Sequence, residues 1–383
     1  MKRIVVMTEF FPVSPDEGPT GGVEQRVSQL VSRLRGWDVR IICSHQPGQP
    51  RRHTYGSATV HRIGPTYPYS HGGDILRRLG FATAAWWKAL TLPRVSVIEG
   101  SSFLSYLPAA LAGIVRGVPR IATYHECWVG QWVRNKGVVT GVFGALWEWL
   151  SLIAGFDLIV AVSEATAAIL RRHGIRNIVV VSNGVSVSSF KGIARQEPSI
   201  PTITYVGRMV PTKNIDVLLR AAAIVNKTVT LRCELIGDGP QRQQLEALAR
   251  SLKLDARFRG FVSSSRDVYR RVAASTIFCM LSSVEGFGIS VVEAMACGVP
   301  VVVADIPPLR EVVGDGVAGV LVPVRDVRAT AAALEQVLRD KERQARLVVA
   351  GRERCVIYDW DIIVGQYSQV LRRVAGRRRN VEP

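Results

Sequence analysis

The sequence lacks the cysteine and histidine patterns that mark disulfide frameworks and zinc sites. None of its six cysteines forms a Cys-x-x-Cys pair, and none has a histidine at metal-ligand spacing. Reduced, mostly buried thiols are therefore expected. No uninterrupted apolar run reaches the roughly 18 residues of a membrane-spanning helix, so no such helix is predicted. These absences exclude a disulfide-rich secreted scaffold and favour a cytoplasmic location. The cysteines are Cys43, Cys127, Cys233, Cys279, Cys297 and Cys355.

Acidic residues are scarce relative to basic ones. The chain has 49 Lys and Arg against 31 Asp and Glu, which gives a formal net charge of +18. The two halves share this excess about equally, so neither is a dedicated basic domain. A charge of this size favours anionic partners, namely phosphorylated donors, acidic lipid surfaces or nucleic acid. Charge alone does not choose among them.

The amino terminus, residues 1–7, is basic and then apolar, as in a secretory signal peptide. Its apolar part is too short for that role, and the polar residues Thr8 and Glu9 follow at once. We therefore predict a buried first strand here.

Short apolar runs alternate with helix-like stretches almost throughout the 383 residues. Runs that are apolar on both faces indicate parallel sheets covered by helices. The length predicts two domains of about 180 residues each. The fold class is therefore α/β, with two facing Rossmann-like parallel-sheet domains and a cleft between them. The predicted strands cover 3–7, 39–43, 95–98, 120–123, 158–162, 178–181, 202–206, 232–236, 276–280 and 299–303.

A polar stretch with prolines and glycine separates the two halves. It begins at Asn183-Gly184-Val185 and ends at Pro201, where the strand pattern restarts. The predicted domains are 1–185 and 200–355, followed by a carboxyl-terminal helix and an arginine-rich tail over 356–383. These tail arginines either attach the chain electrostatically to a surface or are solvated. They are Arg372, Arg373, Arg377, Arg378 and Arg379.

The segment 283–302 is the most informative motif. Gly286 and Gly288 precede a predicted helix, and glycine lets backbone amides approach a ligand closely. A helix start adds unpaired N–H groups and a positive dipole end, which together favour a phosphate. Glu285 and Glu293 are then best explained as acceptors from sugar hydroxyls, because carboxylates otherwise repel an anion. A phosphate and a sugar together indicate a nucleotide sugar.

Arg208 and Lys213 lie in the loop that follows the predicted strand 202–206. A guanidinium and an ammonium that converge there would neutralise a diphosphate leaving group. The alternative is a pair of solvated surface cations. The glycine motif offers a second anion-binding feature in the same half, so we favour the functional interpretation.

The first half offers two further candidates. Gly21 and Gly22 open a helix after the first strand, where they either form a plain turn or let a phosphate or substrate approach the backbone. His125 follows the strand 120–123 and is therefore expected at the carboxyl edge of the sheet, where ligands of such sheets bind. It is either a satisfied loop histidine, or a group that bonds a sugar hydroxyl or helps carry charge in a transition state.

With these motifs in this order, the chain resembles the retaining glycosyltransferases of family 4, which have the two-domain GT-B fold. The resemblance covers nearly the whole chain and is strongest over 200–325. It implies that Arg208 and Lys213 hold the donor diphosphate, and that Glu285 accepts from hydroxyls of the transferred sugar. It implies that Glu293 binds the ribose hydroxyls. The segment near sugar and phosphate comprises Gly286, Phe287, Gly288 and Ile289.

For the first domain, the resemblance implies acceptor binding, with Gly21 and Gly22 against the phosphate and the acceptor entrance. His125 is implied to lie beside the sugar at the reacting centre. The second domain is implied to bind the nucleotide sugar, and the helix within 356–383 to cross back to the first. Two residues depart from the family pattern: Ser290 replaces an aliphatic residue, and Asn214 replaces a glycine.

The implied chemistry is transfer of a hexose with retention. The nucleoside diphosphate leaves, an oxocarbenium-like sugar forms, and an acceptor hydroxyl attacks from the same face. No carboxylate nucleophile is nominated, and a departing phosphate oxygen is available to take the acceptor proton. The donor is a co-substrate, so no cofactor and no metal are expected.

Most of the tryptophans lie between 86 and 149, next to Arg134, Lys136 and a strongly apolar stretch over 138–153. Tryptophan with cations suits a membrane interface and therefore a lipid-linked acceptor on an anionic leaflet. The alternative is that this helix is core and the tryptophans pack inside. These tryptophans are Trp86, Trp87, Trp128, Trp132, Trp147 and Trp149.

Two alternative functions compete with this one. A nucleotide-sugar epimerase of similar fold should show further acid and base carboxylates in the first domain. A nucleic-acid-binding protein would explain the charge, but it predicts a basic stripe with aromatics and no convergent glutamates. The balanced charge and the two glutamates favour the transferase. Its expected partners are a nucleotide-sugar donor and a hydroxyl acceptor that is lipid-linked or a polysaccharide precursor, with no nucleic acid.

Overall fold

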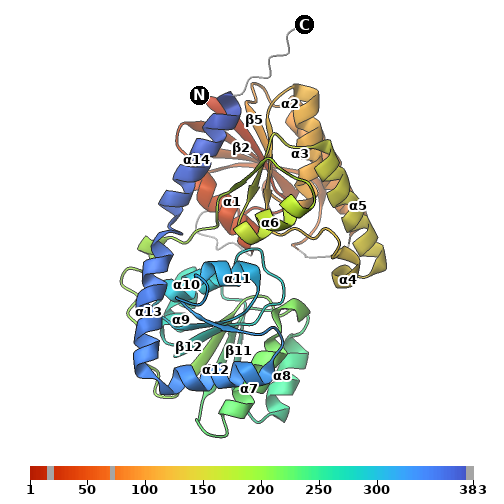
Figure 1. Cartoon of the computed structure of the whole chain (residues 1–383). Coiled ribbons are helices and arrows are strands. Elements are labelled where there is room, and N and C mark those ends of the chain that lie inside the picture. The colour runs from red at the N-terminus through yellow and green to blue at the C-terminus, as the bar shows by residue number, and fades with distance from the viewer. Residues whose placement is uncertain (15–20, 70–73, 377–383) are drawn as a thin grey trace. The chain divides into compact units, whose positions relative to one another are not determined.

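A computed structural model describes residues 1–14, 21–69 and 74–376 of the chain. It divides into two compact units. Unit 1 comprises Met1–Ser182 together with the segment that begins at Asp361, and unit 2 comprises Asn183–Trp360. In each unit, helices cover a largely parallel sheet (Figure 1). The predicted fold class, two Rossmann-like α/β domains, is confirmed. The division falls after Ser182, three residues before the end of the predicted first domain 1–185.

Unit 1 is built on a sheet with the strand order β3-β4-β2-β1-β5-β6-β7-β8 in its described part. All neighbours pair in parallel except β3 and β4, which form an antiparallel edge. The edge strand β3 and its neighbour β4 were missed, because β3 is largely polar and the apolar run of β4 is broken by His61, Arg62, Gly64 and Pro65. The strands are β1 (Lys2–Met7), β2 (Trp37–His45), β3 (Arg52–Tyr55), β4 (Ala58–Thr66), β5 (Val97–Gly100), β6 (Arg120–Tyr124), β7 (Leu158–Ala161) and β8 (Ile178–Val180).

The helices of unit 1 cover both faces of this sheet. They are α1 (Gly22–Arg33), α2 (Ile75–Thr91), α3 (Phe103–Arg116), α4 (Trp132–Lys136), α5 (Val138–Ala154), α6 (Glu164–Arg172) and α14 (Trp360–Gly376). α2 and α3 bury their apolar residues against β1, β2 and β5 in one core cluster. On the other face, α14 lies with α1 over β1, and Tyr367 of α14 donates a hydrogen bond to Glu99 of β5. Arg372 and Arg373 are exposed on α14, and the other tail arginines lie outside the described residues.

Unit 2 is built on a parallel sheet with the order β11-β10-β9-β12-β13-β14. One apolar core cluster joins its strands to the helices α7, α8 and α12. The strands are β9 (Thr202–Val206), β10 (Arg232–Ile236), β11 (Asp255–Gly260), β12 (Ile277–Met280), β13 (Val301–Ala304) and β14 (Val320–Val322). The helices are α7 (Ile215–Val225), α8 (Arg242–Ser251), α9 (Ser265–Ala273), α10 (Ile289–Ala296), α11 (Pro307–Val312), α12 (Val327–Arg339) and α13 (Lys341–Val356), with short 3-10 turns at Val187–Phe190 and Pro211–Lys213.

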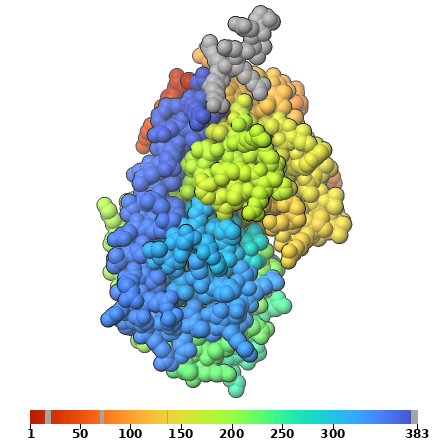
Figure 2. All heavy atoms as spheres, in the orientation of Figure 1, coloured from red at the N-terminus to blue at the C-terminus, as the bar shows by residue number. Residues whose placement is uncertain are grey.

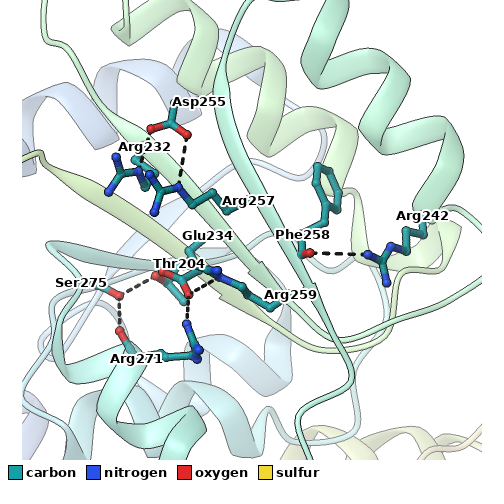
Figure 3. A network of polar contacts seen from close by, with 10 residues as sticks. All are labelled: Thr204, Arg232, Glu234, Arg242, Asp255, Arg257, Phe258, Arg259, Arg271 and Ser275. Carbon is teal, nitrogen blue, oxygen red and sulfur yellow. Dashed lines mark hydrogen bonds and ion pairs between the residues drawn. The ribbon is translucent and has the colours of Figure 1, made fainter.

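The edge strand β11 alternates between charged and apolar residues. Phe258 packs against the core, whereas Arg259 points to the other side of the sheet and pairs with Glu234 at 3.0 Å. Arg271 of α9 reaches the same carboxylate at 2.9 Å (Figure 3). Charged side chains along an edge strand disfavour pairing with another chain. This network therefore serves as edge protection.

The six cysteines are free and buried, which confirms that prediction. Burial raises the pKa of Cys43 and of Cys233 to about 12, so these thiols stay protonated at neutral pH. No helix in the described ranges combines the length and the apolar character needed to cross a membrane.

Candidate active site

The glycine loop before α10 is held rigidly by its surroundings. Gly288 has φ 100° and ψ 52°, a left-handed conformation that favours glycine. A Cβ added there would lie 2.6 Å from Leu309 Cδ2. Phe287 is buried and packs edge-on against Tyr358, with ring centroids 5.2 Å apart. The loop therefore presents the start of α10, whose first N–H groups have no partner within the helix.

Lys213 and Glu285 meet at the carboxyl edge of the second sheet. Lys213 ends the 3-10 turn after β9, and Glu285 lies in the loop after β12, the strand that pairs with β9. Lys213 Nζ lies 2.5 Å from Glu285 Oε1, and the two side chains are only 14% and 11% exposed. The structure thus brings together a cation and a carboxylate that are far apart in sequence.

Asn214 fixes the chain directly after Lys213. It has φ 48° and ψ 43°, a left-handed conformation that asparagine tolerates better than most residues. Its side-chain amide donates to the Leu281 carbonyl at 2.7 Å and accepts from Arg325 at 3.1 Å. Asparagine therefore serves here in place of the glycine that the family pattern has.

Arg208 lies at the same edge and is exposed. No carboxylate among the described residues forms an ion pair with its guanidinium. Its carbonyl accepts a hydrogen bond from the Tyr205 hydroxyl at 2.9 Å. Burial raises the pKa of Tyr205 well above its usual value, the charge of Glu285 raises it further, and that of Arg208 lowers it. Glu285 and Arg208 therefore both lie close enough to Tyr205 to affect the pKa of its neutral phenol. The exposed guanidinium of Arg208 is accessible to an anionic ligand.

Glu293 lies in the second turn of α10 and has its own partner. It accepts a hydrogen bond from the Tyr269 hydroxyl of α9 at 2.9 Å. Burial, and then the charge of Glu293, raises the pKa of Tyr269 far above its usual value, so this phenol stays a donor. The Tyr269 ring also packs on Phe190 at 4.5 Å between centroids. Tyr269 is thus held in place and orients one carboxylate oxygen of Glu293.

Gly21 and Gly22 open α1 in unit 1. Gly21 is the residue before the helix, and Gly22 is its first residue. A Cβ added to Gly21 would lie 3.1 Å from the Tyr69 hydroxyl, so a glycine lets this tyrosine approach the helix start closely.

His125 directly follows β6, as predicted from the strand pattern. Burial and the charge of Arg26 lower its pKa to about 3, and a hydrogen bond with the Ser101 backbone partly opposes this shift. Its Nε2 is buried without a partner in the described part of the chain. The imidazole is therefore neutral at physiological pH. Of the two roles proposed for it, a hydrogen bond fits this environment and a positive charge does not.

Arg26 is the cation that adds to the effect of burial on His125, and it was not among the residues predicted for the site. It lies on α1 and is almost fully buried. It donates to the Ser182 carbonyl at 2.6 Å. Burial lowers its pKa to about 10, so it remains charged at neutral pH. A lone arginine within an amphipathic helix gives no sequence signal for this role.

Glu9 was also missed as a candidate. It follows β1, its side chain lies 3.3 Å from Arg78 of α2, and it is 13% exposed. Burial raises its pKa to about 7 despite the nearby guanidinium. An acid directly after the first strand is the sequence signal that points to this residue.

The expectation of a metal-free site overlooked one Asp-x-Asp triplet, Asp359-Trp360-Asp361. In the structure its two carboxylates have different partners. Asp359 accepts from the Val187 backbone amide at 3.1 Å in unit 2, and Asp361 pairs with Arg33 at 3.5 Å in unit 1. The triplet thus forms part of the connection into α14. The described residues contain no cluster of three or more His, Cys, Asp or Glu that could hold a metal ion.

Two family models match the chain in succession. The model described as "Glycosyltransferase Family 4" matches residues 20–189, and that described as "Glycosyl transferases group 1" matches residues 191–354. The chain is 30% identical to a phosphatidyl-myo-inositol mannosyltransferase of Mycobacterium leprae over 93% of this chain and 94% of that protein. It is 26% identical to an alpha-maltose-1-phosphate synthase of Mycolicibacterium smegmatis over 97% of this chain and 100% of that protein.

Solved structures share the fold over almost the whole length. The sucrose-phosphate synthase of Thermosynechococcus elongatus matches with a TM-score of 0.82 at 22% identity, covering 98% of this chain and 100% of that one. The Anabaena protein HepE in complex with UDP and glucose matches with a TM-score of 0.74 at 18% identity, covering 97% and 100%. The fold is therefore GT-B, and the chain belongs to the family 4 glycosyltransferases.

Proposed function

We propose that this glycosyltransferase moves a hexose from a nucleotide diphosphate sugar to a hydroxyl acceptor, with retention of configuration and without a metal or cofactor. The observation that carries the proposal is the Lys213–Glu285 pair at the same sheet edge as Arg208, for which the described residues offer no ion-pair partner. This arrangement offers positive charge to a diphosphate and a carboxylate to sugar hydroxyls within one small region.

The donor diphosphate would lie between Arg208, Lys213 and the start of α10. Arg208 has no competing carboxylate among the described residues, and a guanidinium binds phosphate oxygens in a bidentate manner. Amides at a helix start add donors, and the helix dipole favours an anion. The Lys213 ammonium group would bind the phosphate as well as Glu285. Donor binding would therefore weaken the ion pair and leave the Glu285 carboxylate available to the sugar.

The two glutamates would bind two different sugars of the donor. When the donor phosphate weakens the ion pair between Lys213 and Glu285, the Glu285 carboxylate would accept hydrogen bonds from hydroxyls of the transferred hexose. Glu293 would accept from the ribose, with one oxygen already held by Tyr269 at 2.9 Å. Unit 2 would therefore bind the donor and unit 1 the acceptor, with Gly21 and Gly22 at the acceptor entrance.

At the reacting centre, a neutral His125 would exchange a hydrogen bond with a sugar hydroxyl through its buried Nε2. As the bond between the sugar and the diphosphate breaks, negative charge grows on the leaving oxygen and is stabilised by Arg208 and Lys213. The acceptor hydroxyl attacks the oxocarbenium-like carbon from the same face, and the departing phosphate oxygen takes its proton.

The acceptor would be lipid-linked and used at the cytoplasmic face of the membrane. The mycobacterial relatives named phosphatidyl-myo-inositol mannosyltransferase support a lipid acceptor, because they cover nearly the whole chain. Family membership also favours transfer over the alternative of an epimerase.

Donor turnover tests this proposal. The purified chain is incubated with uridine- and guanosine-diphosphate hexoses, and released nucleoside diphosphate and sugar products are followed by mass spectrometry. We expect release from one donor, and its loss in Arg208→Ala and Glu285→Ala. Arg346→Ala is the matched control, because Arg346 is an exposed arginine on α13 of the same unit. No release from any donor contradicts the proposal, and so does an epimerised nucleotide sugar as the product.

A further inference from the structure

Helix α5 in unit 1 exposes its large apolar residues to solvent instead of burying them. The residues it buries are small or polar, whereas large apolar side chains point outward. Val138 is 70% exposed, Trp149 is 58% exposed and Ile153 is 61% exposed. A helix at the surface of a globular protein shows the reverse pattern. We call this surface the α5 face; it comprises Val138, Val139, Val142, Leu146, Trp149, Leu150 and Ile153.

The inner side of α5 is packed so closely that the helix cannot turn its apolar side inward. Gly141 lies against the Val133 backbone of α4, where an added Cβ would come within 2.5 Å of Val133 Cα. Glu148 is buried, accepts from the Trp132 indole at 2.7 Å, and accepts from the Trp128 amide at 3.3 Å. Turning the helix would expose these satisfied polar contacts and create clashes. The alternative interpretation, that this helix is core, therefore fails for its outer side.

The neighbouring helix α3 also carries exposed apolar residues. α5 packs alongside α3, whose Ile114 and Val115 are exposed. Figure 1 shows α5 on the outer side of α3, and Figure 2 shows the α4–α5 segment in gold at the surface, with no other part of the chain over it on the face shown. A hollow of about 270 Å³ borders the face and is lined in part by Trp149, Leu152 and Ile153. A surface of this kind marks an interaction site.

The charges around the α5 face indicate which partner covers it. The helices α2 to α5 contain six Lys and Arg and a single carboxylate, Glu148, which is buried. The nearby Glu126 accepts from the Trp128 indole at 2.8 Å, and Arg134 of α4 is exposed. In α4 and α5 the single carboxylate is therefore buried and a cation is exposed, and an apolar surface with tryptophan beside a cation complements an anionic lipid surface.

We propose that the α5 face lies in the interface of an anionic bilayer, with α5 parallel to the membrane plane. The large apolar side chains enter the boundary between head groups and acyl chains, Trp149 lies at that boundary, and the hollow beside it takes part of a lipid chain. No described helix is able to span the bilayer, so the contact is peripheral. This inference extends the proposed function by naming a surface, and it does not depend on which sugar is transferred.

Vesicle co-sedimentation of the full chain tests the inference without any donor present. Phosphatidylcholine vesicles with and without phosphatidylglycerol are compared for the unmodified chain, Leu146→Glu and Trp149→Glu. We expect the unmodified chain to bind the anionic vesicles, and added salt to weaken this binding. The affinity for these vesicles should fall by about tenfold or more in Leu146→Glu and in Trp149→Glu. Val349→Glu is the control, because Val349 is equally exposed but lies on α13 of unit 2. Nucleoside diphosphate release from a water-soluble donor should stay unchanged in the α5 variants.

Three results would overturn the inference. In the first, the unmodified chain stays in the supernatant when the anionic vesicles are sedimented. In the second, both α5 variants bind these vesicles as well as Val349→Glu does. The third is a chain that is dimeric by light scattering and becomes monomeric in Leu146→Glu, because the α5 face is then covered by a second copy. Thermal melting of each variant checks that the substitutions leave the fold intact. Donor release in the absence of vesicles separates a failure here from a failure of the proposed function.

Discussion

Helices α5 and α10 have the same backbone geometry but expose opposite kinds of side chain. α10 buries its aliphatic residues, such as Val291 and Met295, and keeps Glu293 partly accessible beside a glycine loop. α5 buries glycines, a serine and Glu148, and leaves valines, leucines and Trp149 outside. The comparison teaches that the accessible side of a helix reports its partner. A polar side at a sheet edge suits a small charged ligand, whereas an apolar side bordered by cations suits a lipid surface.

Removing the carboxylate of Glu285 should produce the largest effect on the polar side of this comparison. Because it is paired with Lys213 at 2.5 Å and would contact the transferred sugar, Glu285→Ala should lower kcat by about 10²- to 10³-fold. Steady-state kinetics with the donor found above measure this. Glu335→Ala removes a partly exposed glutamate on α12 that pairs with Arg339, and it should keep full activity. A loss below threefold in Glu285→Ala would contradict the assigned role.

Filling the glycine position before α10 should cost stability. Gly288→Ala places a Cβ 2.6 Å from Leu309 in a left-handed conformation, so the free energy of unfolding should fall by about 1–3 kcal/mol. Gly192→Ala is the control, because it has φ 78° but no atom within 4 Å of the added Cβ. Chemical denaturation of both variants gives the difference. Equal losses would show that the backbone conformation, and not the contact with Leu309, dominates.

Glu9 in unit 1 should make stability depend on pH in a defined window. Its pKa is raised from 4.5 to about 7, so the folded chain holds the proton more tightly than the unfolded chain. This contribution is fully present below pH 4.5 and is lost as pH rises through 7. Between these values it should lower the free energy of unfolding by on the order of 1 kcal/mol per pH unit.

The measurement is the difference in unfolding free energy between the unmodified chain and Glu9→Gln across pH 4 to 8. Taking this difference removes the opposing contribution of His125, whose pKa is lowered. A difference that does not change with pH would show that the pKa of Glu9 is the same in the folded and the unfolded chain, and would contradict the raised value.

Tyr269→Phe should give the smallest effect. It removes one hydrogen bond at 2.9 Å to Glu293 and keeps the ring packing on Phe190. The Michaelis constant for the donor should rise about 3- to 10-fold, with kcat nearly unchanged, because a single hydrogen bond is worth about 0.5–1.5 kcal/mol. A kcat that falls as much as in Glu285→Ala would place Tyr269 at the reacting centre instead.

The central strands were predictable because they are apolar on both faces. Residues 202–206 and 299–303, for example, lie at or next to the observed β9 and β13. The edge strands β3 and β11 escaped prediction, since one side of each faces solvent or ion pairs and the apolar run is broken. Helix α13 was missed as well, because Lys, Arg and Glu mask its sparse buried residues.

At the site, motif spacing located the carboxyl-edge residues but not their partners. The loop positions of Lys213 and Glu285 follow from strand order, yet their direct pairing depends on β9 lying next to β12. The neutral state of His125 depends first on its burial and then on the charge of Arg26, which approaches from a helix distant in sequence. Contacts of this kind come from tertiary packing, for which a single sequence carries no local signal.

The central claim is that the carboxyl edge of unit 2 binds a nucleoside diphosphate, and calorimetric titration with UDP and GDP tests it most directly. The account predicts that one of the two binds the unmodified chain. Binding should weaken by about tenfold or more in Arg208→Ala and Lys213→Ala, and remain unchanged in Leu146→Glu. Binding of neither nucleotide, or equal binding by the two cation variants and the unmodified chain, would contradict the account.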